Sequence, residues 1–375
     1  MKHVSVLALS AMTTIGAIPF GAIAAAPVSH LNANGIAVHN IAVIQHSAMM
    51  NAFDNFNGQY TTSFTRPVYQ EATPDDVIAE EPIEEKRDVS KDYGKMSTYG
   101  EYGDDGTVFL PKRGRSGGDD DTFNNSLWVD WHHVQDTAKF DKFKPVDSNQ
   151  DLISIGFADT PEQLSNGYAQ FGGFGGIIIS SEDADDTELN ESGEYIGLYR
   201  GYRINNLSIN MAADFGTLFT DVKSPLAKQD LTNMWLGAAA NVSYDIVLDE
   251  ESVFQPGLYA GYTWVHSTGY DSRSGHGVSF DDFNAFELSP ALRIISKLGN
   301  DWYGTISGRY VFNFASGGDA HISHPDVAEL DLIDYAEYGV TFEKNMERFN
   351  FAISLNRRDG GRTGWNGGVR MQYRF

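Results

Sequence analysis

The carboxy-terminal stretch from Trp365 to Phe375 alternates between apolar or small side chains and polar ones. Because successive side chains of a strand point to opposite faces, Trp365, Val369, Met371 and Phe375 would share one face, with Arg370 among those on the other. A strand with one apolar face, one polar face and an aromatic end is typical of the last strand of a membrane β-barrel. A soluble edge strand can alternate in the same way, so the interpretation depends on the rest of the chain.

Twelve segments from residue 126 onward have the length and alternation of tilted membrane strands. An even strand number is typical of single-chain bacterial barrels. The sequence therefore predicts an all-β fold, a transmembrane antiparallel up-and-down β-barrel of about twelve strands. The expected strands are residues 126–134, 150–158, 167–179, 193–204, 206–215, 231–246, 253–265, 283–295, 301–314, 330–343, 347–357 and 364–375.

The connections between these segments alternate in length, as they do in a barrel with short periplasmic turns and longer extracellular loops. Short turns are expected at Asn205 and at residues 247–252, 296–300 and 344–346. Long connections are expected at residues 135–149, 180–192, 216–230, 266–282 and 315–329. A soluble sandwich has no reason to follow this rule.

Composition narrows the function classes. The 375 residues include 38 glycines and 13% aromatic residues, yet the mean hydropathy is negative, which suits a barrel that interleaves a polar interior with an apolar exterior. A net charge of −24 argues against a nucleic-acid partner, because such a partner requires a basic surface. The absence of cysteine excludes disulfides and thiolate chemistry.

The amino-terminal part of the chain differs from the barrel region. Residues 1–26 have the apolar stretch and alanine-rich exit of a signal peptide. Residues 27–125 contain prolines, an acidic cluster and a glycine-rich run, so we expect a short, mostly disordered passenger or linker, with one short helix near Val77 to Lys95. Residues 126–375 form the barrel domain. Beyond the signal peptide, no stretch is apolar enough for a spanning helix.

Charged residues within the strands are candidates for the lumen, since an arginine facing lipid at mid-depth costs ~2–4 kcal/mol. In the fourth strand the facing stays open, because Arg200 shares a face with Ile196 and Leu198, while Tyr195 and Tyr199 share the other face with another arginine. The lumen-facing charged candidates are Arg203, Glu287, Arg293, Arg309, Glu337 and Arg370.

Several stretches of the barrel region resemble the carboxy-terminal translocator barrel of autotransporters, the type V secretion proteins. Pro256, Leu258 and Tyr262 match a P-x-L-x-x-x-Y strand of that family, and Pro290 begins a match to its P-x-L-R strand. The matching stretches are YIGLYRGYRINNLSINMAADFG, NMWLGAAANVSYDI, VFQPGLYAGYTWV, FELSPALRI and the terminal MQYRF.

The resemblance implies a carboxy-terminal assembly signal at Tyr373 and Phe375, together with the barrel-assembly machinery and periplasmic chaperones as partners. It further implies a monomer in the outer membrane of a Gram-negative bacterium, in contact with lipid and lipopolysaccharide, with the amino-terminal region at the cell surface. In the family, a helical segment joined to the passenger occupies the pore. Here only residues 27–125 are available as a passenger, which is unusually short. Thr107 to Asn125, with Pro111 and several glycines, is a poor helix, which counts against active passenger secretion.

No constellation in the sequence indicates catalysis, a cofactor or a metal. His132 and His133 point to opposite faces of a strand and cannot share one metal, and they are better explained as an interfacial pair. Ser274 and His276 lie with Asp281 and Asp282 in one glycine-rich loop without a rigid scaffold. The acidic run at residues 119–121 lacks the spacing of a calcium loop.

Two functions remain for a non-enzymatic barrel of this kind. The first is a translocator or anchor of the autotransporter type, which passes or displays the short amino-terminal region at the cell surface. The alternative is a passive outer-membrane pore for small solutes, in which the inward charges would set ion preference. A barrel enzyme finds no convergent site in the sequence.

Overall fold

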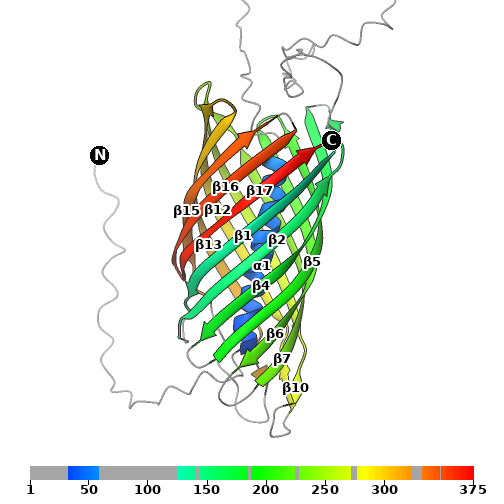
Figure 1. Ribbon diagram of the computed structural model, residues 1–375, viewed down its shortest axis with the longest axis vertical. Coiled ribbons are helices and arrows are strands. Elements are labelled where there is room, and N and C mark those ends of the chain that lie inside the picture. Colours follow the sequence, from blue (N-terminus) through cyan, green and yellow to red (C-terminus); the bar gives the residue numbers. More distant parts are fainter. Residues whose placement is uncertain are drawn as a thin grey trace, which may run out of the picture.

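The computed structural model describes residues 33–58, 125–140, 144–164, 166–184, 187–223, 228–271, 277–318, 320–321, 332–346 and 348–375. In these parts of the chain, twelve long strands close into one antiparallel barrel around a helix (Figure 1). The predicted fold class is therefore confirmed.

Each barrel strand pairs with the barrel strands before and after it in the chain, and β17 closes the ring by pairing with β1. At this seam Ser126 lies opposite Arg374, and the main chains of Asn125 and Phe375 exchange hydrogen bonds of 3.2 and 3.0 Å. Every barrel strand thus has two neighbours, which satisfies main-chain groups that lipid cannot. The barrel strands are β1 (Ser126–Ala138), β2 (Val146–Ala158), β4 (Gly167–Ala184), β5 (Thr187–Ile204), β6 (Leu207–Lys223), β7 (Lys228–Tyr244), β9 (Ser252–Ser267), β12 (Phe283–Gly299), β13 (Trp302–Ser316), β15 (Tyr335–Asn345), β16 (Phe349–Gly360) and β17 (Arg362–Arg374).

Short strands lie in the connections. β3 (Glu162–Leu164) pairs with β4, and β8 (Ile246–Val247) pairs with β9. At the opposite end of the barrel, β10 (Tyr270–Asp271), β11 (Gly277–Phe280) and β14 (Ala320–His321) form a small separate sheet. This end carries the longer connections between β9 and β12 and between β13 and β15, and we call it the long-connection end. The other end, where both Asn125 and Phe375 lie, is the short-turn end.

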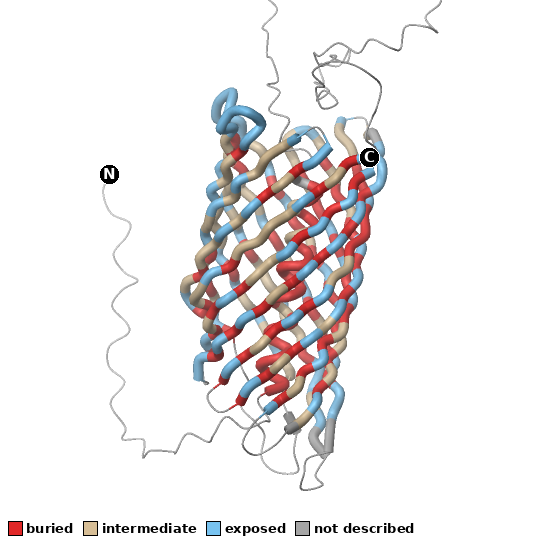
Figure 2. The backbone as a smooth tube through the Cα atoms, viewed as in Figure 1, coloured by how far each residue is buried: buried red, intermediate tan, exposed pale blue. Residues whose placement is uncertain are grey.

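Burial alternates residue by residue along the strands, as the banded tube in Figure 2 shows. In β2, for example, Ile155 and Phe157 point outward and are 52% and 51% exposed, while Leu152 and Ser154 point inward and are buried. Large apolar side chains repeat this exposure around the whole wall. An apolar exterior around a buried polar and aromatic interior is the distribution that a bilayer requires.

The strand whose facing the sequence leaves open is β5. Its Tyr195 and Tyr199 point inward and are buried, whereas Ile196 and Leu198 point outward. Arg200 also points outward, near the short-turn end, where its Nη2 lies 2.9 Å from a carboxylate oxygen of Glu162 and its guanidinium stacks 5.2 Å from the ring centre of Tyr202.

Two of the expected long connections are wrong. Residues 180–192 and 216–230 mostly belong to strands, because β4 continues to Ala184, β5 begins at Thr187, β6 continues to Lys223 and β7 begins at Lys228. Apart from Phe219, the outward side chains of these extensions are polar, and Lys223 Nζ lies 3.3 Å from Glu188 Oε1. Main-chain pairing continues beyond the apolar belt without an apolar face, so hydropathy alone ends such strands too early.

The helix α1 (Ala33–Gly58) lies inside the barrel, where Figure 1 shows it in blue behind the front strands. The expectation that residues 27–125 are mostly disordered is therefore wrong for residues 33–58. This segment has no core of its own, but the lumen supplies the surface that it packs against. The expected helix at Val77 to Lys95 and the poor helix at Thr107 to Asn125 lie outside the described residues, apart from Asn125 itself.

The direction of α1 follows from its contacts. Near its amino-terminal end, Asn34 Nδ2 donates to Ser267 Oγ at the long-connection end of β9. Near its carboxy-terminal end, Phe56 lies against Gly201 and 6.1 Å from the ring of Tyr168, both at the short-turn end. The helix therefore runs from the long-connection end to the short-turn end, and β1 begins at that same short-turn end.

Candidate functional site: the occupied lumen

Apolar residues of α1 pack on the wall formed by β1 to β9. Ile41, Ile44, Met49 and Phe53 are fully buried there. A Cβ at Gly201 would lie 2.4 Å from Phe56 Cδ2, so only glycine lets the helix approach this closely. The same cluster includes aromatic side chains from the wall: Trp128, Phe174, Tyr195, Tyr199, Trp235 and Tyr259.

A second apolar cluster surrounds the start of α1 at the long-connection end. Ala33, Ile36 and Ala37 are buried against Phe140 and Leu332, which come from two different connections. Phe140 and Leu332 also form an isolated β-bridge. The amino-terminal end of the helix is thus covered rather than open to water.

Polar side chains of α1 reach the wall at several depths. Asn40 Nδ2 donates to Glu191 Oε2 over 2.6 Å, and Thr263 Oγ1 donates to Gln45 Oε1 over 2.7 Å. Closer to the short-turn end, Asn51 Nδ2 donates to Asp130 Oδ1 over 2.8 Å. One turn beyond, Asp54 forms an ion pair with Arg293, in which Asp54 Oδ1 lies 3.0 Å from Arg293 Nη1. These bonds fix the helix in one register, because a shift by one residue would leave buried groups unpaired.

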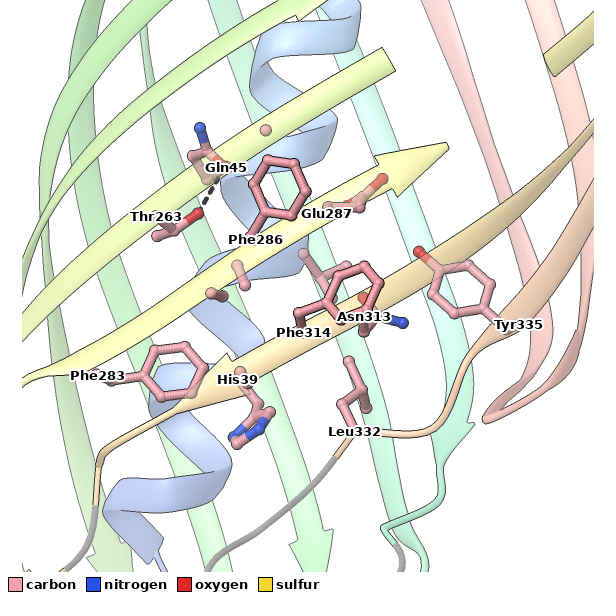
Figure 3. A pocket seen from close by; sticks show the side chains of 15 residues that line it. His39, Gln45, Thr263, Phe283, Phe286, Glu287, Asn313, Phe314, Leu332 and Tyr335 are labelled. Atoms are coloured by element: carbon pink, nitrogen blue, oxygen red, sulfur yellow. Dashed lines mark hydrogen bonds between the residues drawn. The ribbon is translucent and has the colours of Figure 1, made fainter. Parts of the chain in front are cut away.

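His46 is the contact of α1 with the opposite wall. Its Nδ1 lies 2.8 Å from Glu287 Oε1, its Nε2 contacts the guanidinium of Arg309, and its ring lies 4.6 Å from that of Tyr259. A neutral ring suits both neighbours, since it can place a proton on Nδ1 beside the carboxylate and leave the lone pair of Nε2 toward the arginine. Figure 3 shows the narrow space beside this contact, between α1 and strands β12 and β13, with Glu287 and Tyr335 on its lining.

Beyond His46, strands β13 to β17 and β1 hold a buried network of ion pairs. Arg309 Nη2 lies 2.7 Å from Glu337 Oε1, and Arg358 bridges Glu337 and Asp136 with two contacts of 2.8 Å. Arg362 completes it with a 2.8 Å contact to Asp136. Charged side chains are tolerated in a buried position when they are paired with opposite charges, as they are here. The ion pairs therefore join the strands of this part of the wall to one another.

The structure places the predicted lumen candidates as follows. Glu287, Arg309 and Glu337 meet in and beside the His46 contact, and Arg293 holds Asp54. Arg203 lies buried apart from them at the short-turn end, where it pairs with Asp245 and donates to Ser208 Oγ over 2.7 Å.

The remaining candidates lie on β17 and at its end. Arg370 faces Glu343 at 3.6 Å. Tyr373 packs 4.8 Å from the ring of Phe349 and 6.2 Å from that of Phe375, on the outer surface of the short-turn end.

The sequence interpretation missed the residues of α1 that contact the wall, above all Asn40, Gln45, His46 and Asn51. It also missed Asp136, Arg358 and Arg362, which tie the network together. The available signal was the proline-free run from Ala33 to Gly58, which is long enough for a helix but has polar residues on all its sides.

Nothing in the described part of the chain indicates a metal site, because no group of three or more His, Asp or Glu side chains converges there. His132 and His133 do point to opposite faces, and His133 is on the outside, 3.1 Å from Asp151. Ser274, His276 and residues 119–121 lie outside the described residues. Among the helices of the described residues, none has both the length and the apolar run of a membrane span.

Comparison with known proteins gives the class of this fold. The structure is similar to the transport unit of the autotransporter AIDA-I from Escherichia coli, with a TM-score of 0.57 and 14% sequence identity over 67% of this chain and 90% of that one. It is also similar to the β-domain of the Bordetella autotransporter BrkA (TM-score 0.57, 14% identity, 67% and 100% covered). The translocator domain of NalP from Neisseria meningitidis is a further match (TM-score 0.57, 8% identity, 68% and 90% covered).

No family model and no curated protein matches the sequence. At this identity the likeness shows the fold, which is the twelve-strand barrel of autotransporter translocator domains. The chain has the barrel fold of autotransporter translocator domains with a helix of its own in the lumen, and the resemblance seen in the sequence is confirmed at the level of fold.

Proposed function

We propose that this protein is a non-enzymatic translocator and anchor of the autotransporter type in a Gram-negative outer membrane. In this proposal the long-connection end is extracellular, α1 is the segment retained in the lumen, and the residues between the expected signal peptide and Ala33 are displayed outside. Residues 59–124 then join the short-turn end of α1 to β1 on the periplasmic side.

The observation that carries the proposal is the direction of α1. The helix enters at the long-connection end and leaves at the end where β1 starts. A chain that had been threaded outward through the lumen, with its last segment held inside, would have this direction. A helix whose amino terminus stayed at the periplasmic end of the lumen would run the other way.

The alternative, a passive pore, is less well supported. The helix covers aromatic side chains such as Trp128 and Trp235, and its buried apolar side chains leave little room for a continuous water path. Conduction would require α1 to leave, with loss of the contacts to Glu191, Asp130 and Arg293.

Single cysteines test the proposal directly, because the native chain has none. His30→Cys would lie just before α1, and Thr61→Cys just after it. We expect a membrane-impermeant maleimide to label the first variant on intact cells and the second only after the outer membrane is permeabilised. Labelling of Thr61→Cys on intact cells, with His30→Cys protected, would refute the proposed direction.

A further inference from the structure

Two places on the outer wall repeat one arrangement of tryptophan, histidine and aspartate. Between β1 and β2, Trp131 Nε1 donates to Asp151 Oδ1 over 2.9 Å, and His133 Nδ1 lies 3.1 Å from the same oxygen. The indole and imidazole rings stack with centres 6.1 Å apart and an angle of 30° between their planes. We call these three residues the first outer triad.

The second outer triad lies between β9 and β12. Trp264 Nε1 donates to Asp282 Oδ2 over 3.2 Å, and His266 Nδ1 lies 2.8 Å from Asp282 Oδ1. The two rings are again 6.1 Å apart, at 20°. In both triads the histidine follows the tryptophan by two positions on one strand. In the first triad the aspartate lies opposite the histidine on the neighbouring strand, and in the second it immediately precedes β12.

The two triads lie on opposite sides of the barrel. Going round the ring, β2, β4, β5, β6, β7 and β9 separate them in one direction, and β12, β13, β15, β16, β17 and β1 in the other. Six strands therefore lie on each side. The arrangement recurs at diametrically opposite positions and comes from unrelated stretches of sequence. This indicates that both positions face the same environment outside the barrel.

Both triads also occupy a similar depth. Gln150, the neighbour of Asp151, donates to Asn40 of α1, and Phe283, the neighbour of Asp282, lies 4.7 Å from the ring of His39. These two helix residues are adjacent, so the triads lie at one level of the lumen, toward the long-connection end.

The outer surface changes character at this level. On β1 and β2 the outward side chains toward the short-turn end are apolar, as at Val129 and Ile153, and those beyond the first triad are polar, as at Gln135 and Asn149. On β9 the outward Leu258 is likewise followed by Trp264 and His266, after which the strand ends. The triads thus lie at the border between the apolar belt and water, which is the depth of lipid headgroups.

We propose that each outer triad binds the phosphate group of an outer-leaflet lipid through the Nε2 atom of its histidine. The aspartate fixes Nδ1–H, and no hydrogen bond among the described residues occupies Nε2. The histidine and aspartate side chains are 37% to 47% exposed, so this edge of the ring is accessible. The aspartate accepts from one ring nitrogen and the phosphate oxygens would lie at the other, while the stacked indole covers the face of the ring. The choice of leaflet rests on the proposed function; the phosphate contact does not.

Solid-state NMR of the full chain in bilayers tests the contact. In bilayers of a phosphate-bearing lipid, we expect phosphorus to dephase the Nε2 signals of two histidines out of ten. His133→Gln should remove one of these signals and His266→Gln the other, while Gln135→Ala, on the same face of β1, should keep both. Absence of dephasing in the wild-type chain, or dephasing that survives both histidine substitutions, would overturn the proposal.

Two further arms identify the source of the phosphate. In bilayers of a phosphate-free glycolipid the dephasing should vanish. In a phosphate-free detergent with inorganic phosphate added it should stay absent, because the site requires a phosphate held at headgroup depth. Equal dephasing by inorganic phosphate would overturn the lipid as the ligand. If the lipid contact is present but the cysteine labelling has the reverse pattern, the triads face the other leaflet and only the proposed function fails.

Discussion

At the scale of single residues, Asp136 is one of the two carboxylates that each pair with two buried arginines. Its side chain is fully buried and is the partner of both Arg358 and Arg362. Asp136→Asn should lower the free energy of unfolding by about 3–5 kcal/mol, because removing one member of a buried network leaves the others uncompensated.

Urea unfolding in lipid vesicles measures this loss, with Asp147→Asn as the matched control. Asp147 is exposed on β2 and only accepts a hydrogen bond from Thr137. Equal stability of the two variants would mean that the network does not hold the wall together.

The stability cost of replacing an outer leucine by arginine should depend on its depth in the membrane rather than on its exposed fraction. Leu292 and Leu248 are 55% and 56% exposed, but the first lies within β12 and the second in the turn between β7 and β9. Leu292→Arg should destabilise the barrel by about 2–4 kcal/mol and Leu248→Arg by about 0–1 kcal/mol. Unfolding midpoints in bilayers distinguish the two, and a reversed order would contradict the membrane position drawn from the apolar belt.

At the scale of elements, α1 depends on glycines that leave space for it. Gly201→Leu would place side-chain atoms where the ring of Phe56 lies, and should displace the carboxy-terminal half of the helix. The expected result is raised single-channel conductance in planar bilayers. Gly308→Leu is the control, because a Cβ there has no neighbour closer than 3.9 Å. Unchanged conductance in the first variant, with the barrel folded, would show that the helix tolerates the clash.

The barrel strands were predictable from the sequence because their signal is local. A period of two in FELSPALRI at residues 286–294 needs no knowledge of the partner strand. The helix was not predictable in the same way, since its polar residues contact β1, β5, β9 and β12 and leave no single apolar stripe. The lumen decides its fold, and a lumen is a property of all twelve strands together.

The same distinction applies to the functional residues. The cost of charge in lipid is enough to predict that Arg309 and Glu337 point into the barrel. Their connection to Arg358 and Asp136 depends on the closure of β17 onto β1. Pairing across that seam joins residues from the two ends of the barrel domain, which no local pattern encodes.

At the scale of the whole molecule, the seam between β1 and β17 decides whether a barrel exists. Deleting Phe375 removes two main-chain hydrogen bonds to Asn125 and the aromatic contact to Tyr373. We expect a smaller fraction of heat-modifiable, folded protein in the membrane, whereas Phe375→Leu, which keeps the main chain, should fall between the deletion and the wild type. Normal folding of the deletion variant would contradict an assembly role for this end.

The two ends of residues 59–124 are tied to the same rim of the barrel, because α1 leaves where β1 begins. The helix is therefore an intramolecular ligand of its own lumen, and the 66 intervening residues (124 − 58) set its effective concentration there. Doubling the number of residues in such a connection raises the free energy of loop closure by only about 0.6 kcal/mol, so the length of this segment can vary with little effect on binding of the helix. A single cut within this segment has a different consequence, because binding of the helix then becomes intermolecular. Occupancy of the lumen would fall as the cleaved protein is diluted.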